Sequence, residues 1–432
     1  MSAEANVAPT GVELPDGGGA DGSGGMWQAA RDNLKSGNLG VLPVVLGELG
    51  IVLFFGLTAT NFFTASNFVN VILQMAGVTM IAFGVVFVLL LGEIDLSIGY
   101  LSGIAAVAAA EFQLPGTSHD FAGWIAILLA LAIVAVIGFG QGVVVAKVGV
   151  PSFVVTLAGL LIWQGVILRV LELRGVIIIE DNWINNTATY YFSANLSWLI
   201  AAAITLLAAV GALGGLVGHR QAGLALRPGL AIAKVAGVAV ASFGIVAICN
   251  HATRPAKCPE GTPLSVTCTQ SVGLPLAGLL MIIFLVVLTY LAKRTTFGRH
   301  VYAVGGNAEA ARRAGISVAR IRITVFMLSA VMAGVGGIIL SARLQSVNLN
   351  VGGGTLLLDS ISAAVIGGVS LFGGRGEVRG ALLGSLVIAT IANGLNIGGY
   401  STGTIYMVTG IILLLAVTLD TIARRLQMKS GR

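Results

Sequence analysis

Two carboxylates and a hydroxyl lie between two apolar stretches, in the sequence GEIDLSIG at 92–99. A charge at membrane depth costs ~2.5–3.5 kcal/mol on insertion scales, so intramembrane acids usually mark function. Glu93 and Asp95 could therefore couple transport to protons or ions, although residues two apart do not share a helix face. In the other interpretation the pair lies at the membrane edge, where Asp95 or Ser97 caps the next helix. A turn and a pathway site both remain open for Glu93, Asp95, Ser97 and Gly99.

Positive charge concentrates in residues 293–322, where seven Lys and Arg side chains face a single acid, Glu309. Apolar segments of membrane length flank this stretch on both sides. Basic loops between membrane spans stay on the cytoplasmic side during insertion. We therefore expect a cytoplasmic loop over 293–320.

Within this loop the sequence predicts a short helix. Gly305 and Gly306 are expected to break the chain, Asn307 is a good N-cap, and 308–314 are strong helix formers. Gly315 is placed to stop the helix. The result is a helix of about two turns, which either belongs to a solvated loop that only sets topology or docks a cytoplasmic partner.

A second glycine-rich stretch, GGVSLFGGRGEVRG, covers 367–380. So much glycine between two apolar segments indicates a sharp re-entry or a broken helix, which is tolerated only where protein or water covers the backbone. Gly373, Gly374 and Arg375 are expected at the cytoplasmic edge. The stretch is either a tight turn between helices or part of a docking surface.

Several classes of enzyme site are missing from the sequence. It contains no Gly-Lys dipeptide, so it has no Walker A phosphate loop. The 4 His and 3 Cys are scattered, and no catalytic or metal-binding pattern appears. We expect no enzyme activity, no metal and no cofactor in this chain.

The elements that must position these residues are membrane helices. Of the 432 residues, 56% are hydrophobic and 10% are charged, against about 25% charged in soluble domains. Long apolar runs without alternation indicate an all-α polytopic membrane protein. About twelve spans are expected, at 41–62, 68–92, 96–114, 121–146, 150–170, 196–217, 229–249, 273–292, 321–342, 355–373, 377–396 and 402–423.

An even number of spans places both termini on the same side, and basic residues near both ends indicate the cytoplasm. We expect a disordered cytoplasmic tail over 1–40, a transmembrane domain over 41–425 and a short cytoplasmic tail over 426–432. No pattern of a cleaved signal peptide opens the chain.

Two longer segments, 171–195 and 250–272, fall outside by the same count. The second holds Cys258 and Cys268, which could form a disulfide on the oxidising side of the membrane.

Three stretches, 92–103, 297–315 and 360–380, resemble permease subunits of bacterial ATP-binding-cassette sugar importers of the ribose, galactose and xylose type. The matching sequences are GEIDLSIG, where Glu93 replaces a usual Gly, then TFGR, YAVGGN, EAAR and GI, and finally IGGVSLFGG. The resemblance covers roughly 66–170 and 273–425. The intervening block, 171–272, adds two spans to a core of about ten, as in the xylose-type permeases.

The resemblance implies a homodimeric permease of the bacterial cytoplasmic membrane that translocates a pentose or hexose delivered by an extracytoplasmic binding protein. The predicted helix, with Gly306, Asn307, Ala308, Glu309, Ala310, Arg312, Arg313 and Gly315, is then a coupling helix that docks a separate ATPase subunit. ATP and Mg²⁺ would be bound by that ATPase. Asp95 is then a turn residue first and a pathway residue second. Uncharged side chains such as Asn70 and Gln141 could meet a neutral sugar.

The alternative function is an ion-coupled secondary transporter of a small polar solute. It requires a titrating or ion-binding group near the midplane, and only Glu93 and Asp95 qualify. A membrane scaffold or receptor is a second alternative, which the ordered basic loop disfavours.

Overall fold

The computed structural model describes residues 42–429, except 117–119, 222–227 and 256–268. The predicted tail at 1–40 and both cysteines of the predicted disulfide lie outside the described residues. Residues Val44–Arg432 form one unit, and the arrangement below is that of this unit. The domain boundaries expected from the sequence stay predictions.

Helices dominate the described residues, and their bounds follow the apolar segments closely. They are α2 (Leu42–Thr58), α3 (Ala65–Leu90), α4 (Ile98–Phe112), α5 (Gly123–Val143) with a π-helical turn (Val144–Val148), α6 (Ser152–Leu171), α7 (Asn182–Thr189), α8 (Ala194–Gln221), α9 (Pro228–His251), α10 (Leu276–Arg294), α11 (Thr296–Gly306), α12 (Ala308–Arg313), α13 (Val318–Leu344), α14 (Leu356–Ile366), α15 (Val378–Ile397) and α16 (Thr402–Lys429). Among the described residues, 8 helices are long and apolar enough to cross a membrane, and four shorter apolar helices accompany them. The chain is thus an α-helical polytopic protein.

The centre of the fold is built by α3 and α13, which pack on each other and on α4 and α5. Of the most apolar 18-residue stretch of α3, 78% is buried inside the protein. Small residues allow this close packing. A Cβ on Gly337 of α13 would lie 2.0 Å from the carbonyl oxygen of Ser102 in α4, and one on Gly84 of α3 would lie 2.9 Å from that of Ser329 in α13.

The segment expected as a span at 355–373 is helical only over α14, 11 residues. Its helix ends where Gly367 meets the backbone of Gly380, since a Cβ on Gly367 would lie 2.2 Å from the carbonyl carbon of Gly380. Residues 367–377 then form an irregular glycine-rich loop before α15 begins. The broken-helix interpretation of this stretch therefore describes the structure.

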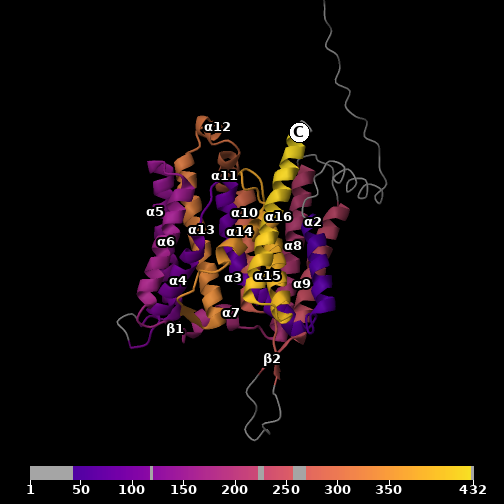
Figure 1. The fold of residues 1–432 in the computed structure, drawn as a ribbon. Helices are drawn as coiled ribbons and strands as arrows, with labels where there is room; N and C mark the ends of the chain where they lie inside the picture. Colours follow the sequence, from indigo (N-terminus) through magenta and orange to yellow (C-terminus); the bar gives the residue numbers. More distant parts are fainter. Residues whose placement is uncertain (1–41, 117–119, 222–227, 256–268, 430–432) are drawn as a thin grey trace, which may run out of the picture. The chain divides into compact units, whose positions relative to one another are not determined.

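Two small antiparallel sheets lie at one end of the helices. Strand β1 (Val176–Ile178) pairs with β4 (Ser346–Asn348), and β2 (Thr253–Pro255) pairs with β3 (Thr269–Ser271). In Figure 1 β1, β2 and α7 lie at the bottom, whereas α12 and the C-terminal end of α16 lie at the top. We call these the sheet end and the α12 end. The described parts of the segments expected outside the membrane, 171–195 together with 250–255 and 269–272, thus meet at the end opposite the basic loop.

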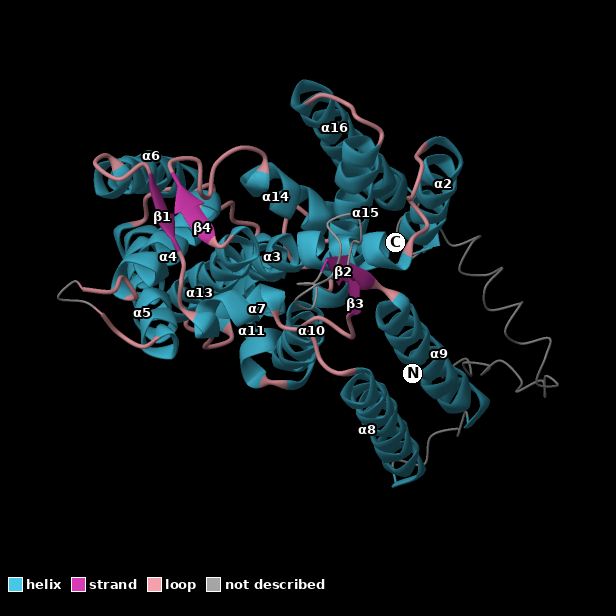
Figure 2. Ribbon diagram, turned by 90° about the horizontal axis from the view of Figure 1, so that it is seen from below, coloured by secondary structure: helices cyan, strands magenta, loops and turns pink. Residues whose placement is uncertain are grey.

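The block at 171–272 contributes α8 and α9, which pack against each other. Trp198 of α8 stacks on Phe243 of α9, with 5.9 Å between ring centroids. Seen along the helices in Figure 2, this pair projects from the rest of the fold beside α10 and β2. Of the most apolar 18-residue stretches of α8 and α9, only 6% and 11% are buried inside the protein. Both helices therefore present apolar side chains to the surrounding medium.

Candidate functional site

The basic loop folds into two short helices rather than one. Helix α11 begins after Thr295, whose hydroxyl accepts a hydrogen bond from the Gly298 N–H at 3.2 Å. Gly305 and Gly306 are the last residues of α11, so the expected chain break occurs one residue later than the sequence suggests, at Asn307. The helix α11 itself was not expected, because its apolar residues are few.

Helix α12 has the ends that the sequence predicts. The Asn307 side chain accepts a hydrogen bond from the Ala310 N–H at 2.9 Å, which satisfies a free donor of the first turn. Gly315, with φ +83°, follows the helix in the left-handed region that favours glycine. On its surface Glu309 forms ion pairs with Arg312 at 2.9 Å and Arg313 at 3.2 Å.

One side of α12 is anchored and the other is free. Ala311 is buried, whereas Glu309, Ala310, Arg312 and Arg313 are exposed. Beneath it, α11 buries Val301 and Val304, and its Phe297 stacks on Phe87 of α3. Four of the predicted coupling residues, Glu309, Ala310, Arg312 and Arg313, therefore form one exposed surface on a short helix, whereas Ala308 packs against the core.

The three sequence motifs meet at one backbone junction beneath α12. The Gly374 N–H of the glycine-rich loop donates a hydrogen bond to the Leu90 carbonyl at the end of α3, at 2.8 Å. A Cβ on Gly305 of α11 would lie only 1.7 Å from that same oxygen. Gly92 and Gly373 face each other across the junction, with positive φ values of 75° and 85°. Displacing α11 must therefore displace both other motifs.

Polar side chains reinforce this junction. The Tyr302 hydroxyl of α11 donates a hydrogen bond to the Gly376 carbonyl at 2.7 Å. Glu377 pairs with Lys293 of α10 at 2.5 Å and also with Arg379. Burial disfavours its charge, but the hydrogen bonds from Lys293 and Arg379 outweigh that effect and hold the pKa of Glu377 below its usual value. The start of α15 is thereby fastened to α10 and α11.

Glu93, which replaces the usual glycine of the resembling family, has a partner that sequence reasoning missed. It forms an ion pair with Arg322 of α13 at 3.0 Å, and the Glu93 side chain is only 14% exposed. Because α13 begins just after α12, this ion pair is a second connection between the segment 92–99 and the basic loop that carries α12. Both residues carried charge at apolar boundaries, but nothing local could show that they meet.

Asp95 stabilises a turn before α4 and is not the N-cap that the sequence suggested. One carboxylate oxygen accepts hydrogen bonds from the Ser97 N–H at 2.9 Å and the Ser97 hydroxyl at 2.6 Å. Ser97 holds the N-cap position, yet its hydroxyl makes no capping bond; it contacts Gln141 of α5 instead, at 3.1 Å to the amide nitrogen. Gln141, considered as a sugar contact, is thus a partner of this turn. Asp95, Ser97 and Gln141 are all buried.

Asp95→Ala should lower the amount of folded protein more than Asp95→Asn. The alanine variant leaves the buried Ser97 N–H without an acceptor, which costs about 1–3 kcal/mol, whereas asparagine keeps an acceptor oxygen. Quantitative fluorescence-detection chromatography of detergent extracts measures the folded fraction. Equal, normal amounts of both variants together with abolished transport would contradict the structural role and favour a pathway role.

A polar cavity of about 600 Å³ opens at the sheet end. The loop 350–354 and the strand β4 form one wall, and Ser102, Ser341, Asp359 and Tyr406 contribute side chains from α4, α13, α14 and α16. One Asp359 oxygen accepts a hydrogen bond from the Thr355 hydroxyl at 2.7 Å, and the other has no hydrogen-bond partner. The cavity therefore offers hydroxyls, amides and backbone groups, and the Asp359 carboxylate is buried in its wall.

Other predicted residues lie apart from these sites. Arg343 does not line this cavity; its guanidinium donates a hydrogen bond to the Asn70 side chain at 3.1 Å. Gly99 packs against the loop 350–354, since a Cβ there would lie 2.8 Å from the Gly352 carbonyl oxygen. Arg375 lies in the glycine-rich loop, where its carbonyl accepts a hydrogen bond from the Ser370 N–H at 3.0 Å. Within the described part of the chain, no cluster of three or more metal-ligating side chains occurs.

Comparison with known proteins gives a consistent result. The sequence profile of a family described as the branched-chain amino acid transport system permease component matches residues 67–417. The xylose transport system permease XylH of Escherichia coli K12 is 33% identical over 405 residues, covering 91% of this chain and 94% of that protein. XylH of Haemophilus influenzae is 33% identical over 402 residues, covering 90% and 98%. The ribose import permease RbsC of Escherichia coli K12 is 30% identical over 377 residues, covering 87% and 92%. No solved structure matches the chain significantly.

Proposed function

The chain belongs to this family of transport-system permease components, and it is a multi-pass protein of the bacterial cytoplasmic membrane; from that premise we propose that it is the membrane subunit of an ATP-driven monosaccharide importer. The observation that carries the proposal is the exposed charged helix α12, mounted on a junction that joins α3, α11 and the loop before α15. A helix so placed can be gripped from outside the membrane, and its movement must be transmitted to the membrane helices.

The α12 end then faces the cytoplasm, as the basic charge of the loop requires. About twelve membrane spans place both termini there too. An ATPase subunit with its own ATP and Mg²⁺ binds the exposed face of α12, where Glu309, Arg312 and Arg313 provide charge complementarity. ATP-driven closure of two such subunits on a homodimer of this chain switches the pathway between outward- and inward-facing states.

Two observations support the substrate class that we propose. The relatives XylH and RbsC are permeases for xylose and ribose by name. The polar cavity at the sheet end lies on the side where an extracytoplasmic binding protein delivers its ligand. Its hydroxyl, amide and carbonyl lining suits a neutral sugar, which needs hydrogen-bond partners rather than countercharges. We therefore propose a pentose or hexose that enters through this cavity.

Ion coupling has less support. Glu93 is neutralised by Arg322, and Asp95 holds the turn before α4. Uptake by proteoliposomes separates the two functions. The chain, reconstituted with the ATPase and the binding protein of its own cells, should accumulate labelled xylose or ribose only when ATP is supplied. Accumulation driven by a proton or sodium gradient without ATP would overturn the importer proposal.

Asp359→Asn should raise the sugar concentration for half-maximal uptake about tenfold. It removes the charge of a carboxylate in the cavity wall while keeping an acceptor for Thr355, and loss of a charge-assisted hydrogen bond to the sugar costs about 1.4 kcal/mol or more. Glu111→Gln is the matched control, because Glu111 lies at the same end in an ion pair with Arg174 outside the cavity. Equal uptake curves for both variants would show that the sugar does not contact Asp359.

A further inference from the structure

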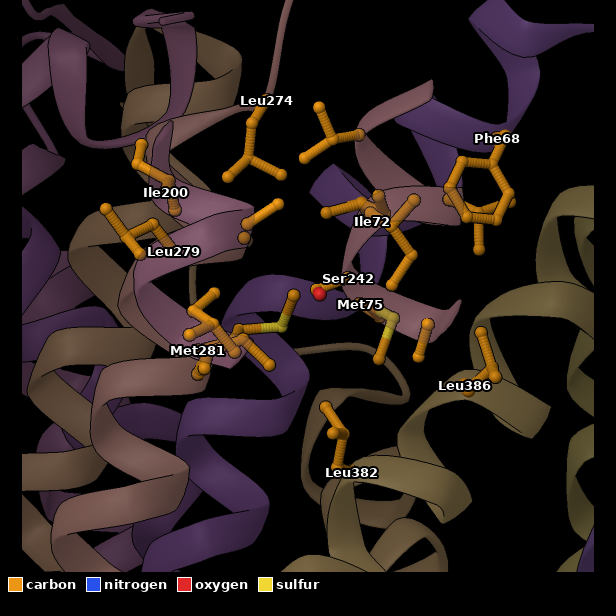
Figure 3. A pocket seen from close by; sticks show the side chains of 18 of the residues that line it. Phe68, Ile72, Met75, Ile200, Ser242, Leu274, Leu279, Met281, Leu382 and Leu386 are labelled. Carbon is orange, nitrogen blue, oxygen red and sulfur yellow. The ribbon is translucent and has the colours of Figure 1, made fainter. Parts of the chain in front are cut away.

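A second cavity separates the α8–α9 pair from the rest of the fold. It has a volume of about 520 Å³ and lies among α3, α8, α9, α10 and α15. Figure 3 shows Phe68 and Leu274 near one end and Leu382 near the other, with Met75 and Met281 between them. We call it the side cavity, and neither the docking surface nor the polar cavity includes it.

The lining of the side cavity is apolar on every wall. Its one hydroxyl side chain, Ser242 of α9, is already satisfied. That hydroxyl donates to the Ala239 carbonyl at 3.2 Å and shares a hydrogen bond with Thr205 of α8, also at 3.2 Å. Water needs two to four polar partners to be stable in a cavity, and apolar cavities stay dry and take up apolar ligands. Neither water nor a sugar therefore suits this space.

The α8–α9 pair is fastened to the core only near the sheet end, as far as the described residues show. There Ser66 of α3 exchanges hydrogen bonds with the Thr253 backbone at 2.9 and 3.1 Å, and the Leu274 N–H donates to Ser197 at 3.0 Å. A small apolar cluster around Val69 and Cys249 closes that end. Beyond this attachment the side cavity lies between the two helices and α3 and α10.

The side cavity is elongated along the helices. On α3 its lining runs from Phe68 to Met75, and on α9 from Val238 to Val246, which is about 10–12 Å of helix at 1.5 Å per residue. An extended apolar chain that runs along the helices, as an acyl chain does in a bilayer, matches this length and this lining.

We propose that the side cavity binds an acyl chain of a membrane phospholipid. The medium around the α8–α9 pair supplies it, because large apolar residues on the outer faces of these helices, such as Leu207 at 73% and Val240 at 76%, are exposed and face lipid in the membrane. Protein interiors tolerate few voids larger than a water molecule, so an acyl chain completes the packing between the inserted pair and the core. The pair thus acts as a clamp that holds lipid against α3 and α10.

Photolabelling tests this assignment. The chain is placed in nanodiscs of phosphatidylethanolamine doped with a phosphatidylethanolamine that carries a diazirine in its acyl chain, and labelled peptides are mapped by mass spectrometry. We expect label at Met75 and Met281, which are 5% and 4% exposed and face the cavity. Ala241→Trp fills the cavity and should reduce that label about fivefold or more. Ala236→Trp, on the exposed face of the same helix, should not.

If Ala241→Trp does not fold, Val238→Phe fills part of the same space with a smaller change in volume. Absence of label at Met75 and Met281 would overturn the proposal, and would mean that α8 and α9 close onto the core or that another chain fills the gap. Equal labelling of the Ala241→Trp and Ala236→Trp variants would overturn it as well. Neither result bears on sugar uptake, which is measured separately.

Discussion

Gly305→Ala should remove most of the folded protein, whereas Gly306→Ala, one residue later, should leave it unchanged. A Cβ on Gly305 would lie 1.7 Å from the Leu90 carbonyl oxygen and 2.9 Å from the Gly374 nitrogen. These are backbone atoms that cannot rotate away, so the change forces apart α3, α11 and the glycine-rich loop. Overpacking of this kind costs about 3 kcal/mol or more. Gly306 is helical and a Cβ there would meet no atom within 4 Å, so alanine is tolerated or mildly stabilising.

Both variants can be compared in one experiment, by chromatography of fluorescent fusions and by thermal unfolding in detergent. The pair is matched in chemistry, helix and position in sequence, so a difference reports the junction alone. Normal folding of Gly305→Ala would contradict the junction, and with it the argument that α12 is rigidly connected to the membrane helices. Equal losses for both variants would point instead to a general intolerance of side chains at the end of α11.

Exchanging the charges of α12, with Glu309→Arg and Arg312→Glu together, should reduce ATP-dependent uptake at least about tenfold without changing the amount of folded protein. The exchange keeps an ion pair between positions 309 and 312 but sets like charges at 309 and 313, and each such pair on an exposed helix changes stability by only about 0.5 kcal/mol. The reversed charges also lose a favourable interaction with the helix dipole, about 0.3–1 kcal/mol each. The outward charge pattern, however, is inverted against any partner, and like charges facing each other across an interface cost several kcal/mol.

A matched control exists at the other end of the molecule. Arg169 and Glu172 form an exposed ion pair of the same spacing at 2.8 Å, close to β1. Exchanging those charges, with Arg169→Glu and Glu172→Arg, should leave uptake and ATPase binding unchanged. Undiminished uptake in the α12 exchange would rule out docking through this charged face, and an equal loss in both exchanges would show that the effect is not specific to α12.

The local features of α12 could be predicted because local residues determine them. Asn307 and Gly315 act within one helical turn of their own positions, and both have the roles that their types indicate. The apolar segments likewise set the helices to within a few residues. The end of α14 was misplaced because 369–373 continue the apolar run, and only contact with Gly380 shows where the helix must stop.

The meeting of the motifs could not be predicted from physical patterns. Leu90, Gly305 and Gly374 are separated by long stretches of chain, and glycine carries no side-chain signal of what it touches. The same holds for Glu93 and Arg322, where each charge suggested a partner but not which one. Strands β1 and β4 have three residues each, too few for a recognisable alternation. The resemblance to one permease family brought these motifs together in the sequence analysis. The structure shows that their backbones are in direct contact.

The most direct test of the account is a crosslink from α12 to its partner. A photoreactive phenylalanine analogue replaces Ala310, which is exposed on α12, and the tagged chain is irradiated in its own cells, purified and analysed by mass spectrometry. The account predicts a covalent adduct with a cytoplasmic subunit that carries a Walker A motif, and no such adduct from the same analogue at Tyr400, an exposed residue of the α15–α16 connection. A chain that folds normally but forms no ATPase adduct from Ala310 would contradict the central claim that α12 is the docking helix of an ATP-driven importer.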